Sequence, residues 1–247
     1  MALQSSGNAI SFSDIQTEFG GESPISMSEY YQDAVPALVT ANNANVGDVG
    51  EALAMSDFYD GVLATLIELE MIGGGGGGAG WGGAAGGDGG ATSISATDVM
   101  FGTGGTPFGG ISKGGGAGGS GYNGTNTSEN GDASYYGAGG QGGLNSTSGN
   151  QTNGFSPAAT SYGAGGGSGG TNFFSGSGPD GGHASSRLAF SFYGVPSGSI
   201  TVTIGAGGAG GIGGFTNGGA GAAGYAKFTV GNDVQEFTSS GTYTVPS

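Results

Sequence analysis

Glycine is concentrated in one part of this chain, where it occurs in runs too long for an ordinary helix or strand. The 247 residues include 64 glycines, and only six of these precede residue 73. From residue 73 on, roughly one residue in three is glycine, against about 7% in ordinary proteins. Glycine has no side chain to pack and loses more backbone entropy on folding than any other residue. The runs are therefore either disordered, or they form a structure that leaves no room for side chains.

The runs themselves discriminate between three structures. They lie at residues 73–90, 102–121, 137–143, 163–170, 176–182 and 205–224. A collagen helix is excluded, because no Gly-X-Y period is sustained and the chain has only seven prolines. A disordered linker agrees with the composition, but apolar segments flank the runs. We favour polyglycine II, an extended threefold left-handed helix that rises about 3.1 Å per residue. Such helices, packed side by side, can pair every N–H and C=O, and an interior Cβ would push neighbours apart.

Apolar segments with strand periodicity border these runs. Residues 62–72 alternate between the two faces of a predicted strand, and Glu68 and Glu70 indicate that one face is exposed to water. The other face carries Leu63, Thr65, Ile67, Leu69 and Met71. Residues 198–205, 225–230 and 235–246 are further predicted strands. We expect residues 62–247 to form a β-rich domain with polyglycine II helices. We also expect residues 235–246 to pair with 62–72, within one chain or between subunits. That pairing would join Phe237, Tyr243 and Val245 with Leu63, Ile67 and Leu69 in one apolar layer.

Residues 1–61 carry a short internal repeat instead of glycine runs. ISFSDI (10–15), ISMSEYY (25–31) and LAMSDFY (53–59) each place a serine and an acidic residue among apolar residues. Ser13, Ser28 and Ser56 can each N-cap a short helical turn, with the acidic residue near its positive end. The segment has few aliphatic residues for a core, so we expect a loop-and-turn segment that attaches to a partner through its aromatic residues. These are Phe12, Tyr30, Tyr31, Phe58 and Tyr59. The alternative is a small domain with its own core.

The segment NAISFSDIQTEFGGESPISMSEYY (8–31) resembles the opening of virion structural proteins of tailed phages, especially cyanophages. TLIELEMIGGGGGGAGWGG, VPSGSITVTIGAGGAGG and NGGAGAAGYAKFTV are similar to the glycine-rich domains of phage tail fibres and to polyglycine-sandwich adhesins. The resemblance implies a homotrimeric tail-fibre or fibre-tip protein whose N-terminal part attaches to other tail proteins. It also implies assembly in the bacterial cytoplasm, location in the virion, and tip loops that bind a host receptor. In the family, FTSSGTYTVP ordinarily precedes the strand that leads into the first glycine run, whereas here it ends the sequence.

Charge and composition exclude several classes of function. The net charge of −15 argues against binding to nucleic acid or to an anionic membrane surface, since both need Lys and Arg. There is no cysteine for a disulfide or a thiolate site, and no apolar run is long enough to span a membrane. No N-terminal stretch combines basic residues with an apolar run, so we expect no signal peptide.

Motifs that resemble catalytic sites are explained by the composition. G-x-G-x-x-G recurs, but no run continues into the G-K-[ST] of a P-loop. His183 is the sole histidine and has no acidic cluster beside it in the sequence, so we expect no metal site. A glycan-cleaving enzyme needs paired carboxylates, and the acidic residues after residue 72 are scattered. We therefore expect neither catalysis nor a cofactor.

The segments between glycine runs carry most of the aromatic residues of the second part. Aromatic rings mixed with Asn, Ser and Gly make an adaptable recognition surface. The predicted receptor-binding residues are Tyr122, Tyr135, Tyr136, Phe155, Tyr162, Phe173 and Phe174. Their expected ligand is a glycan or protein of the host cell surface. Two alternatives stay open: each ring covers a flank of the glycine lattice, or the chain is a purely architectural virion component, such as a neck appendage, baseplate part or capsid decoration.

Overall fold

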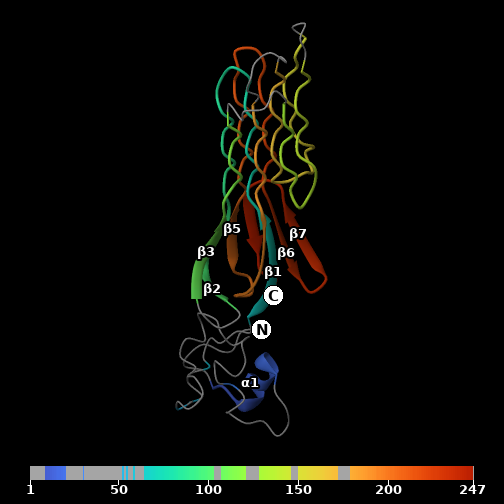
Figure 1. Ribbon diagram of the computed structural model, residues 1–247. Helices are drawn as coiled ribbons and strands as arrows, with labels where there is room; N and C mark the ends of the chain where they lie inside the picture. The colour runs from blue at the N-terminus through green and yellow to red at the C-terminus, as the bar shows by residue number, and fades with distance from the viewer. Residues whose placement is uncertain are drawn as a thin grey trace.

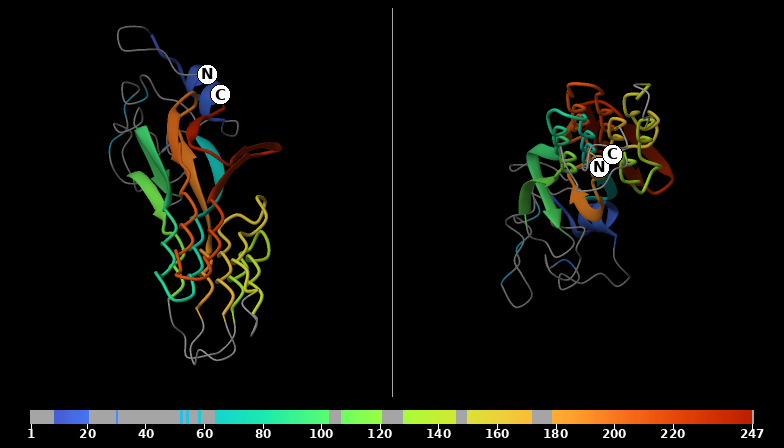
Figure 2. Two further views of the ribbon diagram at one scale, coloured as in Figure 1. Left: turned by 90° about the horizontal axis from the view of Figure 1, so that it is seen from above. Right: turned by 45° about the horizontal axis from the view of Figure 1, so that its top comes forward.

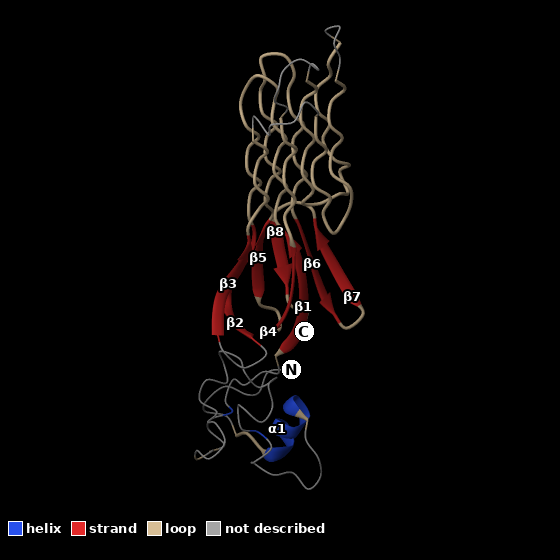
Figure 3. Ribbon diagram, in the orientation of Figure 1, coloured by secondary structure: helices blue, strands red, loops and turns tan. Residues whose placement is uncertain are grey.

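The computed structural model describes residues 9–20, 30, 52, 54, 58, 64–102, 107–120, 128–145, 150–171 and 179–246. From residue 64 on, the described residues form two parts that lie end to end (Figure 1). One part consists of strands, and the other of extended segments that are neither helix nor strand (Figure 3). The expectation of a β-rich fold is confirmed.

All strand pairs are antiparallel, and they form one hydrogen-bonded path. The strands are β1 (Thr65–Ile72), β2 (Thr92–Gly102), β3 (Pro107–Lys113), β4 (Arg187–Gly194), β5 (Ser199–Thr203), β6 (Tyr225–Val230), β7 (Asp233–Phe237) and β8 (Gly241–Thr244). Their order is β7-β6-β1-β4-β2-β5-β8, with β3 also paired to β2. The path folds back on itself at β4 and β2, which share only two residue pairs. Phe228 in β6 and Tyr243 in β8 are far apart in this order, yet their rings stack with centroids 4.2 Å apart. The strands therefore make two facing layers.

The core lies between these layers and follows the alternation of the sequence. In β1, Ile67, Leu69 and Met71 are fully buried, while Leu66 and Glu68 are exposed. Ile200 and Val202 of β5 face them from the other layer, as part of one buried cluster. The predicted faces of residues 198–205 are confirmed at Ile200 and Val202. In residues 62–72 the apolar face is confirmed at Ile67, Leu69 and Met71, but the face assigned to water is exposed at Leu66 and Glu68 and not at Ala64, which is buried, or at Glu70, which is partly buried. Leu63 lies outside the described residues.

The predicted C-terminal strand is wrong in two respects. Residues 235–246 do not form one strand, because a turn separates β7 from β8. β8 pairs with β5, not with β1, whose two edges are already taken by β4 and β6. The apolar layer nevertheless forms within one chain, since Phe237, Tyr243 and Val245 are buried with Ile67 and Leu69.

The second part is a glycine bundle, which we define as ten hydrogen-bonded segments among the described residues. They are 73–80, 84–90, 114–120, 128–132, 137–145, 150–155, 163–170, 179–185, 205–213 and 216–224. Each of β1 to β6 either continues into one of these segments or follows directly from one. The segments run side by side in every view (Figure 2). We call the end remote from the strands the distal end.

Segment 73–80 lies at the centre of a ring of six neighbours. Its successive N–H groups donate to segments 84–90, 216–224 and 179–185 in turn, and every third residue returns to the same neighbour. Its carbonyls accept in the same rotation from 114–120, 205–213 and 163–170. The N···O distances lie between 2.8 and 3.2 Å. The six neighbours are also bonded to one another around the ring, so the centre has no free side.

Segment 163–170 is the centre of a second ring. It is bonded to 128–132, 137–145, 150–155, 179–185, 216–224 and 73–80. The two rings share the segments between their centres, so the bundle is two fused hexagons. Both central segments are buried along their length.

In the outer segments every third residue points outward and is seldom glycine. Ala206, Ala209 and Ile212 are exposed, while the glycines between them face other segments. A Cβ on Gly208 would lie 1.9 Å from the carbonyl oxygen of Gly87. The pattern G-G-x in the outer segments therefore follows burial: the two glycines face other segments, and every third residue faces the solvent.

The N-terminal segment contains helix α1 (Phe12–Phe19), beyond the end of the strands opposite the bundle (Figure 1). Its N-cap is Ser11, not Ser13 as predicted. Ser11 and Asp14 form a reciprocal capping box, which places the acidic residue in the first turn as expected. Ser13 lies within the helix; the predicted caps Ser28 and Ser56 lie outside the described residues.

Candidate functional site

The predicted receptor-binding tyrosines that the structure describes lie at the strand end of the bundle. Tyr136 and Tyr162 pack on Tyr225 of β6, with ring centroids 4.9 and 4.7 Å away. Tyr135 is exposed, and its ring lies 4.5 Å from the guanidinium of Arg187. These aromatic side chains connect the turns between the segments around 163–170 to the strands. Their role in receptor binding stays a prediction.

The other predicted residues do not complete one surface with them. Phe155 is 55% exposed and lies on the flank of the bundle, in segment 150–155. Tyr122, Phe173 and Phe174 lie outside the described residues.

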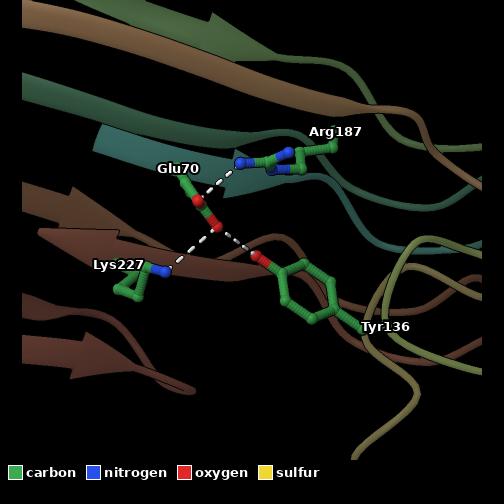
Figure 4. A network of polar contacts seen from close by, with 4 residues as sticks. All are labelled: Glu70, Tyr136, Arg187 and Lys227. Carbon is green, nitrogen blue, oxygen red and sulfur yellow. Dashed lines mark hydrogen bonds and ion pairs between the residues drawn. The ribbon is translucent and has the colours of Figure 1, made fainter. Parts of the chain in front are cut away.

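Glu70 of β1 is the centre of a polar network at the same junction (Figure 4). One carboxylate oxygen accepts from Arg187 of β4 at 2.5 Å. The other accepts from the hydroxyl of Tyr136 at 3.1 Å and lies 3.3 Å from Nζ of Lys227 in β6. Two of the three basic residues of the chain therefore contact one carboxylate. We call this group of four the Glu70 junction; it ties three neighbouring strands to the turn that carries Tyr136.

The junction shifts the pKa of its members in a consistent direction. Partial burial alone would raise the pKa of Glu70, but the hydrogen bonds from Arg187, Lys227 and Tyr136 outweigh it and hold the pKa below its ordinary value. Burial, together with the negative charge of Glu70, raises the pKa of Tyr136. Glu70 is therefore a carboxylate and Tyr136 a neutral donor throughout the neutral range. A cleft at Glu70, Arg187 and Lys227 is lined by Glu68 and Thr229 as well.

A different group of side chains occupies the distal end. Trp81 follows segment 73–80 and is 7% exposed; its backbone N–H donates to the carbonyl of Thr216 at 3.0 Å. Its ring lies against that of Phe215, with centroids 4.5 Å apart and planes inclined by 31°. Phe215 and Ile212 are 73% and 74% exposed, the highest values among the large apolar side chains described. Sequence reasoning missed this group, although the sole tryptophan directly after a run of glycines is a signal for the end of a segment.

Asparagine side chains hold the neighbouring segment ends. Oδ1 of Asn217 accepts the N–H of Gly213 at 3.1 Å, and Oδ1 of Asn153 accepts the N–H of Asn217 at 2.8 Å. Oδ1 of Asn145 accepts the N–H of Thr171 at 2.9 Å. Since each carbonyl oxygen is engaged by the backbone, the orientation of each carboxamide is fixed. Each amide nitrogen is then a donor with no partner among the described residues.

The remaining polar groups form no metal site in the part of the chain that the structure describes. Nδ1 of His183 lies 3.0 Å from Oδ2 of Asp132, and both side chains are largely exposed. Asp180 accepts a hydrogen bond from the hydroxyl of Ser120. These pairs connect neighbouring segments of the bundle.

The predicted attachment residues are divided between the inside and the outside of the N-terminal segment. Tyr30 and Phe58 are buried with Ile15 and Phe19 of α1, and the hydroxyl of Tyr30 donates to the carbonyl of Gly20 at 2.7 Å. Phe12 is exposed. Tyr31 and Tyr59 lie outside the described residues. The described residues therefore include a small internal cluster, the feature expected of the alternative interpretation, and attachment stays a prediction.

Comparison with known proteins adds no relative to this picture. No family model, no curated protein and no solved structure matches the chain. Among the residues that the structure describes, no helix has the length and apolar character needed to cross a membrane.

Proposed function

We propose that this protein is a virion component of a tailed phage, a tail-fibre or fibre-tip protein that presents the distal end of its bundle to the host cell. The N-terminal part attaches it to other tail proteins. The observation that carries the proposal is the polarity of the domain. Residue 64 and residue 246 lie at one end, where the hydroxyl of Thr65 donates to the carbonyl of Pro246. The glycine bundle extends from the other end (Figure 1).

We further propose that the ten segments are polyglycine II helices. In such a helix three residues complete a turn, so three directions of bonding repeat along the chain. The rotation of hydrogen bonds around segments 73–80 and 163–170 supports this identity. A bundle of this kind is rigid without an apolar core, because its cohesion comes from peptide groups bonded on all sides. Rigidity is what a long projecting tip requires.

The proposal is tested on the virions of the encoding phage. We expect antibodies against residues 64–246 to label the outer end of a tail appendage in electron micrographs. A chain that lacks residues 1–61 should stay soluble and fail to enter virions, whereas the full chain should enter them. Labelling of the capsid or neck would favour the architectural alternative, and normal incorporation of the shortened chain would refute attachment through residues 1–61.

A further inference from the structure

We propose that the distal end binds an uncharged, hexose-containing glycan, with the ring of Phe215 as its stacking platform and the carboxamides of Asn217 and Asn153 as donors to its hydroxyl groups. The inference rests on the proposed function, since it assumes that this end faces the host. It assigns the ligand class and the residues that recognise it.

Trp81 and Phe215 form an aromatic pair at the distal end. One face of Phe215 lies against Trp81, and the side chain is nevertheless 73% exposed. The other face of the ring is therefore open to solvent. Trp81 is held by the backbone bond to Thr216, so the platform is fixed before any ligand arrives, which lowers the entropy cost of binding. A pyranose ring has a face of C–H groups that stacks on such a surface.

The exposure of Phe215 has no explanation in the packing of the bundle. The centre of the bundle excludes side chains, and Phe215 therefore has no core to enter. Ile212 continues the row of outward residues that begins at Ala206 and Ala209. The row changes from methyl groups to a large apolar side chain only where it reaches the distal end, beside Phe215.

Polar side chains lie at the same end of the bundle as Phe215. The Oδ1 atoms of Asn217 and Asn153 accept backbone N–H groups. Their amide nitrogens are pre-oriented donors, and the two residues are directly linked through the bond from the N–H of Asn217. An apolar ring face and oriented N–H donors at one end of the molecule match a sugar, which presents C–H groups on one side and hydroxyl oxygens at its edge.

The distribution of charge restricts the ligand further. The chain has three basic residues, Lys113, Arg187 and Lys227. All three lie on strands β3, β4 and β6, which adjoin the end of the bundle opposite Phe215. With a net charge of −15, the distal end offers no cation to a phosphate, sulfate or uronate group. We therefore assign an uncharged glycan instead of an anionic one.

The test uses the full chain on a printed array of uncharged oligosaccharides of glucose, galactose, mannose and N-acetylglucosamine, with uronic acid oligosaccharides as the charged comparison. We expect binding to at least one uncharged set and none to the charged set. Phe215→Ala should weaken that binding by about tenfold or more, as truncation of a central aromatic residue does. Asn217→Asp keeps the acceptor for Gly213 and removes the donor, so it should also weaken binding. Val234→Ala, which truncates an exposed apolar side chain on strand β7, away from the distal end, should bind like the unchanged chain.

The same variants on host cells separate this inference from the proposed function. Cell binding that is abolished by periodate oxidation of surface sugars and by Phe215→Ala supports the inference. Cell binding that survives periodate and is lost on protease treatment would identify a protein receptor and refute the glycan, while the proposed function stands. An array without any bound sugar, or equal binding by Phe215→Ala, would also refute it. If the unchanged chain binds no host cells at all, the proposed receptor-binding function fails as well.

Discussion

A methyl group added at the centre of the first ring tests the hydrogen-bonded lattice directly. Gly76 donates to the carbonyl of His183, and its own carbonyl accepts from Gly166. A Cβ at Gly76 would lie 1.9 Å from the carbonyl oxygen of Ala117 and 2.4 Å from its carbonyl carbon. Ordinary contact begins at 3.4 Å, so Gly76→Ala forces segments 73–80 and 114–120 apart by more than an ångström.

The magnitude follows from the bonds between these two segments. Gly116 donates to the carbonyl of Gly74 at 2.8 Å, and Gly119 donates to that of Gly77 at 2.9 Å. A displacement of this size breaks both bonds, and each contributes about 1 kcal/mol net. Overpacking typically costs about 1–3 kcal/mol more. Alanine also restricts the unfolded chain more than glycine does, and this offsets about 0.4–1 kcal/mol of the loss. We expect a net loss of about 2–4 kcal/mol in the free energy of unfolding.

The assay is thermal unfolding beside a matched control. In a domain of this size about 1 kcal/mol shifts the Tm by about 2–4 °C, so Gly76→Ala should lower the Tm by about 5–15 °C. Gly114 is the control, because its added Cβ meets no heavy atom within 4 Å and its φ is not positive. Gly114→Ala should therefore leave the Tm unchanged or raise it slightly. Equal melting of Gly76→Ala and Gly114→Ala would refute the lattice and favour a flexible linker.

Two further predictions concern the Glu70 junction. Tyr136→Phe should lower the free energy of unfolding by about 1–2 kcal/mol, because a partly buried donor to a carboxylate is lost, whereas Tyr135→Phe should be neutral in the same urea titration. The folded-state pKa of Glu70 is lowered from the ordinary value of 4.5, so its contribution is complete above pH 4.5 and is lost as the pH falls through the lowered pKa. Glu70→Gln should thus be less stable than the unchanged chain at pH 7, and the difference should shrink below pH 4.5; a difference independent of pH would contradict this reasoning.

The strands were predictable where the alternation of apolar residues is uninterrupted. Residues 62–72, 198–205 and 225–230 contain β1, β5 and β6 because one face of each strand enters the core. Residues 187–194 carry a similar alternation in Leu188, Phe190 and Phe192, but β4 and β2 are not among the predicted strands. β3 is hidden in the sequence for a physical reason. Its exposed Gly109 and Gly110 extend the neighbouring glycine run, so composition does not separate the strand from the run.

The candidate site could be predicted only as a class of residues. Aromatic residues occur in turns at both ends of the bundle, and their composition does not tell which end a turn occupies. Tyr136 and Tyr162 lie at the strand end, where burial against Tyr225 is available. Phe215 lies at the distal end, where Trp81 is the one aromatic ring among the described residues that packs against it. The distinction depends on how many times the chain has reversed direction, which is a property of the whole topology.

The C-terminal strands show how a wrong pairing can accompany a correct core. The sequence pattern predicts which residues are apolar on one face, and this decides that Tyr243 and Val245 enter the interior. It does not decide which strand edge is free. β1 is bonded on one edge by β4 and on the other by β6, so the last strand has to bond elsewhere. β5 offers an edge in the facing layer. From there Tyr243 reaches the core and stacks on Phe228. The core is closed within one chain, and exchange of this strand between subunits is not required to complete it.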